Sequence, residues 1–210
     1  MTELHKSLVT VHHSSDEQGL GFLSKRGFIL TAAHCLPGQP RPAGMLADTV
    51  EVQVSSFLDP SVQAVVHVTF AEPVSDVAVL AMGADLDAFC DLQESLQPVP
   101  LHLDVFRDKQ DIEVLIPTHE GKILEGAAEV FLPWQSNATV QFSDPNERVK
   151  GGTSGAPAFT AAGRVLGIVN WGPEQQAECN IVLLATALPA STIIQHHPEL
   201  VSILDVFRKG

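Results

Sequence analysis

The sequence predicts an all-β protein in which two six-stranded antiparallel β-barrels are followed by a short C-terminal helix. Three observations support this fold class. Short apolar segments recur along the chain with turn-forming residues between them, clear amphipathic helices are scarce, and the segments form two sets of about six with a break between them. Many short strands at this spacing are typical of a sandwich or of barrels, and the break favours two barrels in tandem.

The expected strands are these apolar segments, taken in chain order. The first set comprises residues 7–11, 19–24, 28–31, 50–54, 64–70 and 77–81. The second set comprises residues 112–116, 121–130, 139–142, 156–160, 165–171 and 181–187. Residues 36–48, with three prolines and two glycines, are expected to form a surface loop. We therefore assign residues 1–95 to an N-terminal barrel and residues 111–190 to a C-terminal barrel.

The break between the two sets lies at residues 96–110, which we assign to an inter-barrel linker. Pro98 and Pro100 lack the backbone N–H that a central strand needs. After Pro189 the apolar pattern changes, and residues 191–210 are expected to contain the C-terminal helix.

The charge balance limits the partners. Lysine and arginine contribute 12 positive charges against 25 acidic residues, so the formal net charge is −13. Such a surface repels phosphate backbones and anionic lipids, so we expect neither nucleic acid nor a membrane as a partner. The opening residues carry Glu3 and histidines where a signal peptide would carry a long apolar run, so with Met1 as the native start we expect a cytoplasmic protein.

Cysteine usage agrees with that compartment. Cys35, Cys90 and Cys179 are an odd number, with no CxxC pair and no metal-type spacing. We expect three reduced thiols, no metal and no cofactor.

Three short segments carry residues suited to catalysis. An apolar strand over residues 27–31 ends in small residues and is followed by His34. Asp76 stands directly before an apolar strand, where a buried carboxylate needs a partner such as an imidazole. Ser154 lies among glycines in GGTSGAP, where a tight turn can place converging backbone amides beside a nucleophile. Taken singly, each has a structural explanation: a hydrogen-bonded histidine, a turn-capping aspartate and an incidental loop serine.

Two other motifs are excluded at the glycine-rich segment. Ala156 stands where the GxSxG elbow of α/β-hydrolases has its second glycine. No lysine follows the glycines as a phosphate-binding loop requires.

Together, the TAAHC, SDVAVL and GTSGAP segments resemble the chymotrypsin/trypsin-like serine proteases, in which histidine, aspartate and serine follow in this order. Residues 167–172, GIVNWG, look like the strand that lines the specificity pocket of that family, and residues 96–101 look like its inter-barrel linker. The resemblance covers most of the chain and implies the double β-barrel fold of this family.

The resemblance also implies roles for individual residues. Ser154 would attack the scissile carbonyl, His34 would act as general base and then as general acid, and Asp76 would orient the imidazole. The backbone amides of Gly152 and Ser154 would form the oxyanion hole. The implied substrate-binding residues are Val169, Asn170, Trp171 and Gly172.

The chain departs from secreted members in two places. The strand at 19–24 has no cysteine that could pair with Cys35, so we expect a free thiol there. Thr153 stands where trypsin-like zymogens have an aspartate that pairs with a new N-terminus, and no IVGG-like start is present. We therefore expect no activation by N-terminal cleavage; activity would be constitutive or gated by a partner that orders residues 143–152.

Substrate preference has two interpretations. Counting back from Ser154 puts Arg148 near the base of the specificity pocket, where an arginine would select acidic side chains. In the other interpretation, Arg148 points to solvent. Val182, roughly opposite, would instead make the pocket shallow and suited to small apolar residues.

The sequence thus predicts a serine endopeptidase that acts on a protein or peptide, with a regulatory domain or partner protein as a possible restraint. The alternative is a protease-fold module that holds a peptide by strand addition at residues 169–172, with weak or no catalysis. An esterase using the same triad is a third interpretation.

Overall fold

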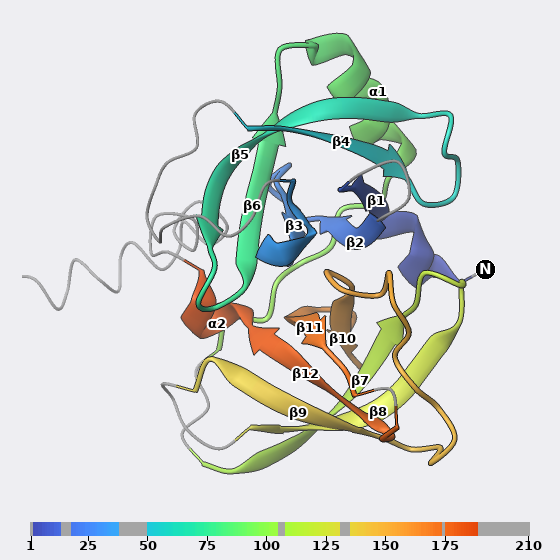
Figure 1. Ribbon diagram of the computed structural model, residues 1–210, viewed down its shortest axis with the longest axis vertical. Coiled ribbons are helices and arrows are strands. Elements are labelled where there is room, and N and C mark those ends of the chain that lie inside the picture. Colours follow the sequence, from blue (N-terminus) through green and yellow to red (C-terminus); the bar gives the residue numbers. More distant parts are fainter. Residues whose placement is uncertain are drawn as a thin grey trace, which may run out of the picture.

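The structure is a computed structural model (Figure 1). The described residues are 2–13, 18–37, 50–104, 108–130, 135–173 and 175–188. The helix expected within 191–210 and most of the loop expected at 36–48 lie outside these residues.

The first barrel closes in the strand order β1-β2-β3-β6-β5-β4, with all neighbours antiparallel. Its strands are β1 (Leu8–His12), β2 (Gln18–Leu23), β3 (Ile29–Thr31), β4 (Glu51–Ser56), β5 (Gln63–Glu72) and β6 (Val77–Met82). In β4, Val52 and Val54 face the core while Glu51 and Gln53 face solvent, as the period of two requires.

The second barrel closes in the order β10-β11-β12-β9-β8-β7. Its strands are β7 (Gln110–Pro117), β8 (Ile123–Val130), β9 (Asn137–Phe142), β10 (Pro157–Thr160), β11 (Val165–Trp171) and β12 (Glu178–Leu183). Each expected strand has its counterpart, and the prediction of two six-stranded antiparallel barrels is confirmed.

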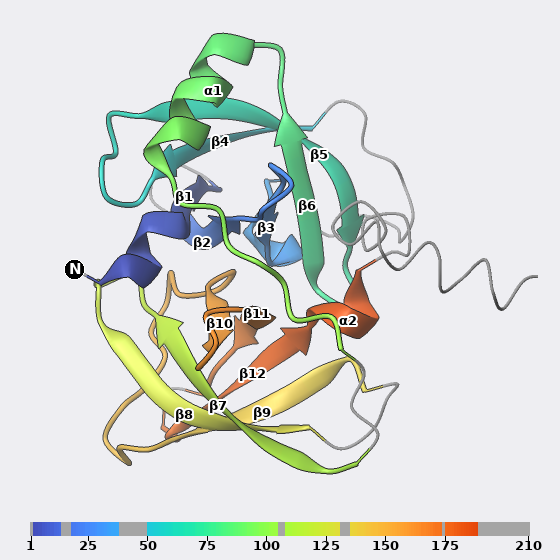
Figure 2. The same ribbon diagram turned by 180° about the vertical axis from the view of Figure 1, so that it is seen from behind.

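The two barrels share their cores. Leu20 of β2 packs into the hydrophobic cluster of the second barrel, while Phe159 and Ile168 of the second barrel pack into that of the first. The segment after the first barrel runs along the back of both (Figure 2), where the Val99 N–H donates to Leu23 O at 3.0 Å. Further on, the Val165 N–H donates to Pro100 O at 2.9 Å, so this segment is fastened to each barrel.

Two helical elements differ from the expectation. Helix α1 (Leu86–Ser95) lies within residues 1–95, where the sequence analysis expected no helix. It begins at the N-cap Asp85, whose Oδ1 accepts from Ala88 N at 3.0 Å. Phe89 and Leu92 bury one face of α1 on the outside of the first barrel (Figure 1). The last expected strand, 181–187, ends at Leu183, and its remainder forms helix α2 (Leu184–Ala187).

Two short 3-10 helices complete the described elements, η1 (Glu3–Ser7) before β1 and η2 (Ala33–Cys35) after β3. Among the described residues, no helix has both the length and the apolar character needed to cross a bilayer.

Candidate active site

His34 and Asp76 come together because their strands are neighbours. β3 pairs with β6, with Thr31 opposite Ala78, so η2 after β3 lies beside the residue that precedes β6. Asp76 Oδ2 accepts from His34 Nδ1 at 2.7 Å, and Asp76 Oδ1 accepts from the His34 backbone N–H at 2.9 Å. Asp76 has a φ of 56°, a left-handed conformation that aspartate adopts more readily than most residues.

The Asp76 carboxylate determines the electrostatics of the imidazole. Its hydrogen bond, and then that of the Cys35 thiol, raise the pKa of His34 from 6.5 to about 10, against the opposing effect of burial. Because Nδ1 donates to the carboxylate, the neutral ring keeps Nε2 as its acceptor. The His34 side chain is 48% exposed, so this nitrogen is accessible to a reacting group.

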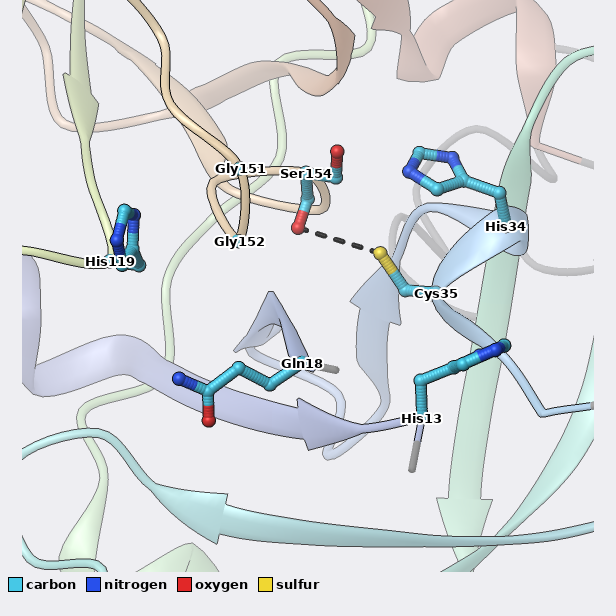
Figure 3. Close-up of a pocket in the computed structure, with 8 residues that line it drawn as sticks. All are labelled: His13, Gln18, His34, Cys35, His119, Gly151, Gly152 and Ser154. Atoms are coloured by element: carbon cyan, nitrogen blue, oxygen red, sulfur yellow. Dashed lines mark hydrogen bonds between the residues drawn. The ribbon is translucent and has the colours of Figure 1, made fainter. Parts of the chain in front are cut away.

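Ser154 opens into the same cavity as His34. The cavity has a volume of about 450 Å³ and is lined by residues of both barrels: His13, Gln18, His34, Cys35, His119, Gly151, Gly152 and Ser154. Figure 3 shows the Ser154 side chain and the His34 ring next to each other at this cavity. Ser154 Oγ makes no hydrogen bond to any described residue, and in free enzymes such catalytic bonds are often long until substrate binds.

Residues 150–155 are here called the nucleophile loop. The C-terminal end of this loop is hydrogen-bonded to both barrels. Ser154 O accepts from the Leu20 N–H at 2.7 Å, and the Gly155 N–H donates to Val169 O at 2.8 Å. Gly155 has a φ of 85°, and a Cβ there would lie 1.8 Å from Leu20 O. Only glycine fits this position, because its backbone touches β2 directly.

Some amides of the nucleophile loop have no acceptor among the described residues. The N–H groups of Thr153, Gly155 and Ala156 donate to carbonyls within the protein. Those of Gly151, Gly152 and Ser154 have no acceptor in the described chain, and all three residues line the cavity. The amides of Gly152 and Ser154 are the pair that the sequence motifs led us to expect in an oxyanion hole. Gly152 reaches this arrangement with a φ of 86°. Paired free amides beside a nucleophile are the arrangement that stabilises an oxyanion.

A family model described as "Trypsin-like peptidase domain" matches residues 19–168, well over half of the chain. The chain belongs to this family. The matched segment contains His34, Asp76 and Ser154, and the resemblance to trypsin-like serine proteases that the sequence motifs indicated is confirmed at the level of the family. No curated protein sequence matches the chain.

Several solved proteases have a similar fold. A serine protease of a human pathogenic astrovirus is 18% identical with a TM-score of 0.58, over 89% of this chain and 92% of that one. The Rv3671c protease from M. tuberculosis in its active form is 20% identical with a TM-score of 0.53, over 86% and 76%. The serine endoprotease from Yersinia pestis is 13% identical with a TM-score of 0.56, over 94% and 68%. At these identities the likeness shows the fold.

The strand that this trypsin-like peptidase domain was expected to use for substrate lies next to the nucleophile loop. Val169, in β11, is buried and its N–H donates to Ala156 O at 2.9 Å. The register of β11 shifts between Val169 and Trp171, and Asn170 Oδ1 is buried with no hydrogen-bond partner among the described residues. Trp171 is 58% exposed, and Gly172 packs against the chain at Val149. None of the four expected residues lines the Ser154 cavity.

Arg148 does not line the Ser154 cavity. Its guanidinium Nη1 donates to Pro145 O and to Glu147 O, both at 2.6 Å. It lines a separate hollow of about 260 Å³ on the second barrel, and Val182 is buried in the core. The assignment of Arg148 to substrate binding stays a prediction that this geometry does not support.

Sequence reasoning missed several residues that line the cavity, namely His13, Gln18 and His119. Nothing in their local sequence distinguishes them from ordinary strand or turn residues, because the fold alone gathers them beside Ser154.

Cys35 was expected to be a free thiol, which is confirmed. Its Sγ lies 3.6 Å from Ser154 O, and a Cβ on Gly19 would lie 2.4 Å from Sγ, so glycine on β2 makes room for the thiol.

Proposed function

We propose that this protein is a serine endopeptidase in which Ser154 is the nucleophile, His34 the general base and acid, and Asp76 the group that orients His34. The observation that carries the proposal is the coincidence of three features at one cavity. They are the 2.7 Å His34–Asp76 pair, the presence of Ser154 and His34 at the same cavity, and the amides of Gly152 and Ser154, which have no acceptor among the described residues.

The chemistry follows from these positions. Ser154 Oγ attacks the scissile carbonyl while its proton passes to His34 Nε2, and the developing oxyanion accepts hydrogen bonds from the two free amides. His34 then gives the proton to the departing amine, which leaves an acyl-enzyme on Ser154. Water, deprotonated by the same nitrogen, hydrolyses the ester and restores the hydroxyl. Asp76 stabilises the imidazolium formed in each half-reaction.

A peptide is the substrate that suits the surroundings of the cavity. The cavity is open and lined mainly by polar groups, and β11 with its exposed Trp171 leads away from the nucleophile loop. Extended peptides bind proteins along strand edges, where backbone bonds supply affinity and side-chain pockets supply selectivity. We keep Val169–Gly172 as the proposed peptide-binding segment.

Activity without N-terminal cleavage is the second part of the proposal. Thr153 is fully buried, and its hydroxyl is hydrogen-bonded to His119 at 3.2 Å, so the residue before the nucleophile needs no ion pair. Restraint of the activity would then come from a regulatory domain or partner protein.

The proposed compartment is the cytoplasm. Cys35, Cys90 and Cys179 are all unpaired, which supports a reducing compartment.

The test is cleavage of a peptide library, read by mass spectrometry, with wild type, Ser154→Ala and the control Ser143→Ala. Ser143 is an exposed serine outside the cavity. We expect internal peptide bonds to be cleaved by wild type and Ser143→Ala, with a loss on the order of 10⁶-fold in Ser154→Ala. Peptides bound but left intact by wild type would favour the non-catalytic peptide-binding module, and turnover of esters alone would favour an esterase.

A further inference from the structure

We propose that His119 is a positioning residue that holds the N-terminal half of the nucleophile loop, and with it the Gly152 amide, in the geometry that stabilises the oxyanion. The inference rests on the proposed function. It concerns a residue that no motif singled out and that belongs to a different element from the triad, the turn between β7 and β8.

The turn that carries His119, residues 118–122, is closed by its own hydrogen bonds. The Thr118 N–H donates to Lys122 O at 2.9 Å, and the Gly121 N–H donates to Thr118 O at 3.0 Å. The Lys122 N–H also donates to Thr118 Oγ1 at 3.2 Å. A turn with several internal hydrogen bonds at the end of a long strand pair is a firm support for a side chain.

His119 contacts the nucleophile loop in two ways. Its Nδ1 is hydrogen-bonded to Thr153 Oγ1 at 3.2 Å, and Thr153 is fully buried, so this bond satisfies a hydroxyl that is shielded from water. The ring also lies against Gly152, because a Cβ built there would be 3.3 Å from His119 Cγ. Figure 3 shows the ring standing beside Gly151 and Gly152 on the side of the loop away from His34.

A second tie joins the same two segments. Lys150 Nζ lies 2.8 Å from Glu120 Oε1, one residue along the turn from His119. In the described chain, the polar contacts that connect residues 150–153 with another element all run to this turn. The Lys150–Glu120 pair is largely exposed and contributes little by itself, so the partly buried His119–Thr153 bond is the main constraint.

The two halves of the nucleophile loop are held by different contacts, and this makes the His119–Thr153 bond important for catalysis. Ser154 and Gly155 are fastened to β2 and β11, so the nucleophile stays in place without the turn. Gly152 has no such bond, and its amide direction depends on the residues on either side of it. Loss of the His119 contact therefore allows one oxyanion donor to move while the triad remains. A misplacement near 1 Å costs about 10²-fold in rate.

The experiment measures kcat and KM for a peptide substrate in four variants: His119→Ala, His119→Asn, Thr153→Val and Thr153→Ser. We expect kcat to fall on the order of 10- to 100-fold in His119→Ala and Thr153→Val, with KM changed less than about 3-fold, because the donor acts in the transition state. Thr153→Ser and His119→Asn retain a hydrogen-bonding group and should recover most of kcat. The double variant His119→Ala/Thr153→Val should lose little more than either single variant.

Matched controls separate positioning from general destabilisation. His67→Ala removes an exposed histidine paired with Glu51, and Ser55→Ala removes a hydroxyl that is bonded to His12 at 3.0 Å, both in the first barrel. Both should keep wild-type kcat. If His119→Ala does not fold, the Thr153→Val and Thr153→Ser pair decides the question.

Amide hydrogen exchange of residues 150–155 gives a readout that needs no catalysis. The Thr153 N–H donates to Lys150 O within the loop, so faster exchange of the Thr153 amide in His119→Ala and Thr153→Val supports the inference even if wild type cleaves no peptide, in which case the proposed function fails separately. Exchange and kcat both within about 2-fold of wild type in the folded variants would overturn the inference, as would an equal loss of kcat in Ser55→Ala.

Discussion

At the scale of single residues, Asp76 combines two tasks that its backbone conformation makes possible. With a φ of 56°, its carboxylate reaches both the backbone N–H and the ring of His34. The first bond fixes η2 and the second sets the tautomer and the pKa of the imidazole. Strain at such a position persists where the surrounding contacts determine it, and here the two bonds to His34 do so.

The raised pKa of His34 predicts the pH dependence of the reaction. A general base must be neutral, and a pKa raised from 6.5 toward about 10 leaves His34 protonated at lower pH, so kcat/KM rises with pH and its midpoint lies above 6.5. Asp76→Asn removes the largest cause of the raised pKa, so the midpoint falls toward 6.5 while the plateau drops about 10⁴-fold.

The check is a profile of kcat/KM from about pH 5 to about pH 10 for wild type, Asp76→Asn and the control Glu51→Gln. Glu51 lies beside His67 on the first barrel, far from His34 in the sheet. An unchanged midpoint in Asp76→Asn, or an equal shift in Glu51→Gln, would contradict the assigned cause.

The sequence singled out the catalytic candidates because each stands in a distinctive local context: a histidine after an apolar strand, an aspartate before one, and a serine among glycines. Their pairing geometry follows from strand neighbourhood, which the motif order implies. His119 has no such context. Its hydrogen bond to Thr153 joins residues 34 positions apart, and only the closed second barrel brings that turn to the loop.

At the scale of elements, the conformation of the nucleophile loop depends most on Gly155. Gly155→Ala combines a φ of 85° with a Cβ 1.8 Å from Leu20 O, so β2 or the loop must move. We expect a loss of about 2–4 kcal/mol in the free energy of unfolding, and loss of activity. Denaturant unfolding and peptide turnover measure the two effects.

Gly163→Ala is the matched control for that substitution. Gly163 has a φ of 71° with nothing within 4 Å of an added Cβ, so it carries the conformational cost without the clash. It should lose about 1 kcal/mol and keep its activity. Equal destabilisation of the two variants would show that contact with β2 is unimportant.

Helix α1 could not be predicted from the periodicity of apolar residues alone. The twelve strands were recognisable because apolar residues alternate or run continuously in each, whereas α1 buries only Phe89 and Leu92 among many polar residues. Its apolar signal is therefore weak over ten residues, and Asp85 is a helix start that resembles a turn. Similarly, the apolar run that enters β12 continues into α2, because a buried strand and a buried helix look alike in sequence.

The packing of α1 makes a prediction about stability alone. Leu92 is fully buried, so Leu92→Ala should cost about 2–5 kcal/mol in the free energy of unfolding. Leu86→Ala, at a position 54% exposed, should change it by less than about 0.5 kcal/mol. Below the unfolding transition both variants should keep wild-type kcat, since α1 lies outside the cavity. A selective loss of kcat in folded Leu92→Ala would contradict this separation.

At the scale of the whole molecule, the site exists because the barrels are held against one another. The pair His34–Asp76 comes from the first barrel and the nucleophile loop from the second. Interlocked core residues and the segment through Val99 and Pro100 fix the two halves, which suits a reaction that needs groups from both.

The net charge of −13 predicts how substrates approach this assembly. For peptides with the same cleaved bond, added lysines distant from it should raise kcat/KM about 3- to 10-fold over added glutamates at low ionic strength. The difference should shrink as salt rises, because screening weakens long-range attraction. Measurement of kcat/KM over a salt series checks this. A salt-independent ratio, or a preference for the acidic peptide, would count against it.

The most direct test of the central claim is the site at which a fluorophosphonate reacts, mapped by mass spectrometry of the labelled, digested protein. The account predicts one adduct per chain, on Ser154, formed far more slowly in His34→Ala and absent in Ser154→Ala, with Ser143→Ala unchanged. An adduct on another serine, or equally fast labelling of Ser154 without His34, would contradict it.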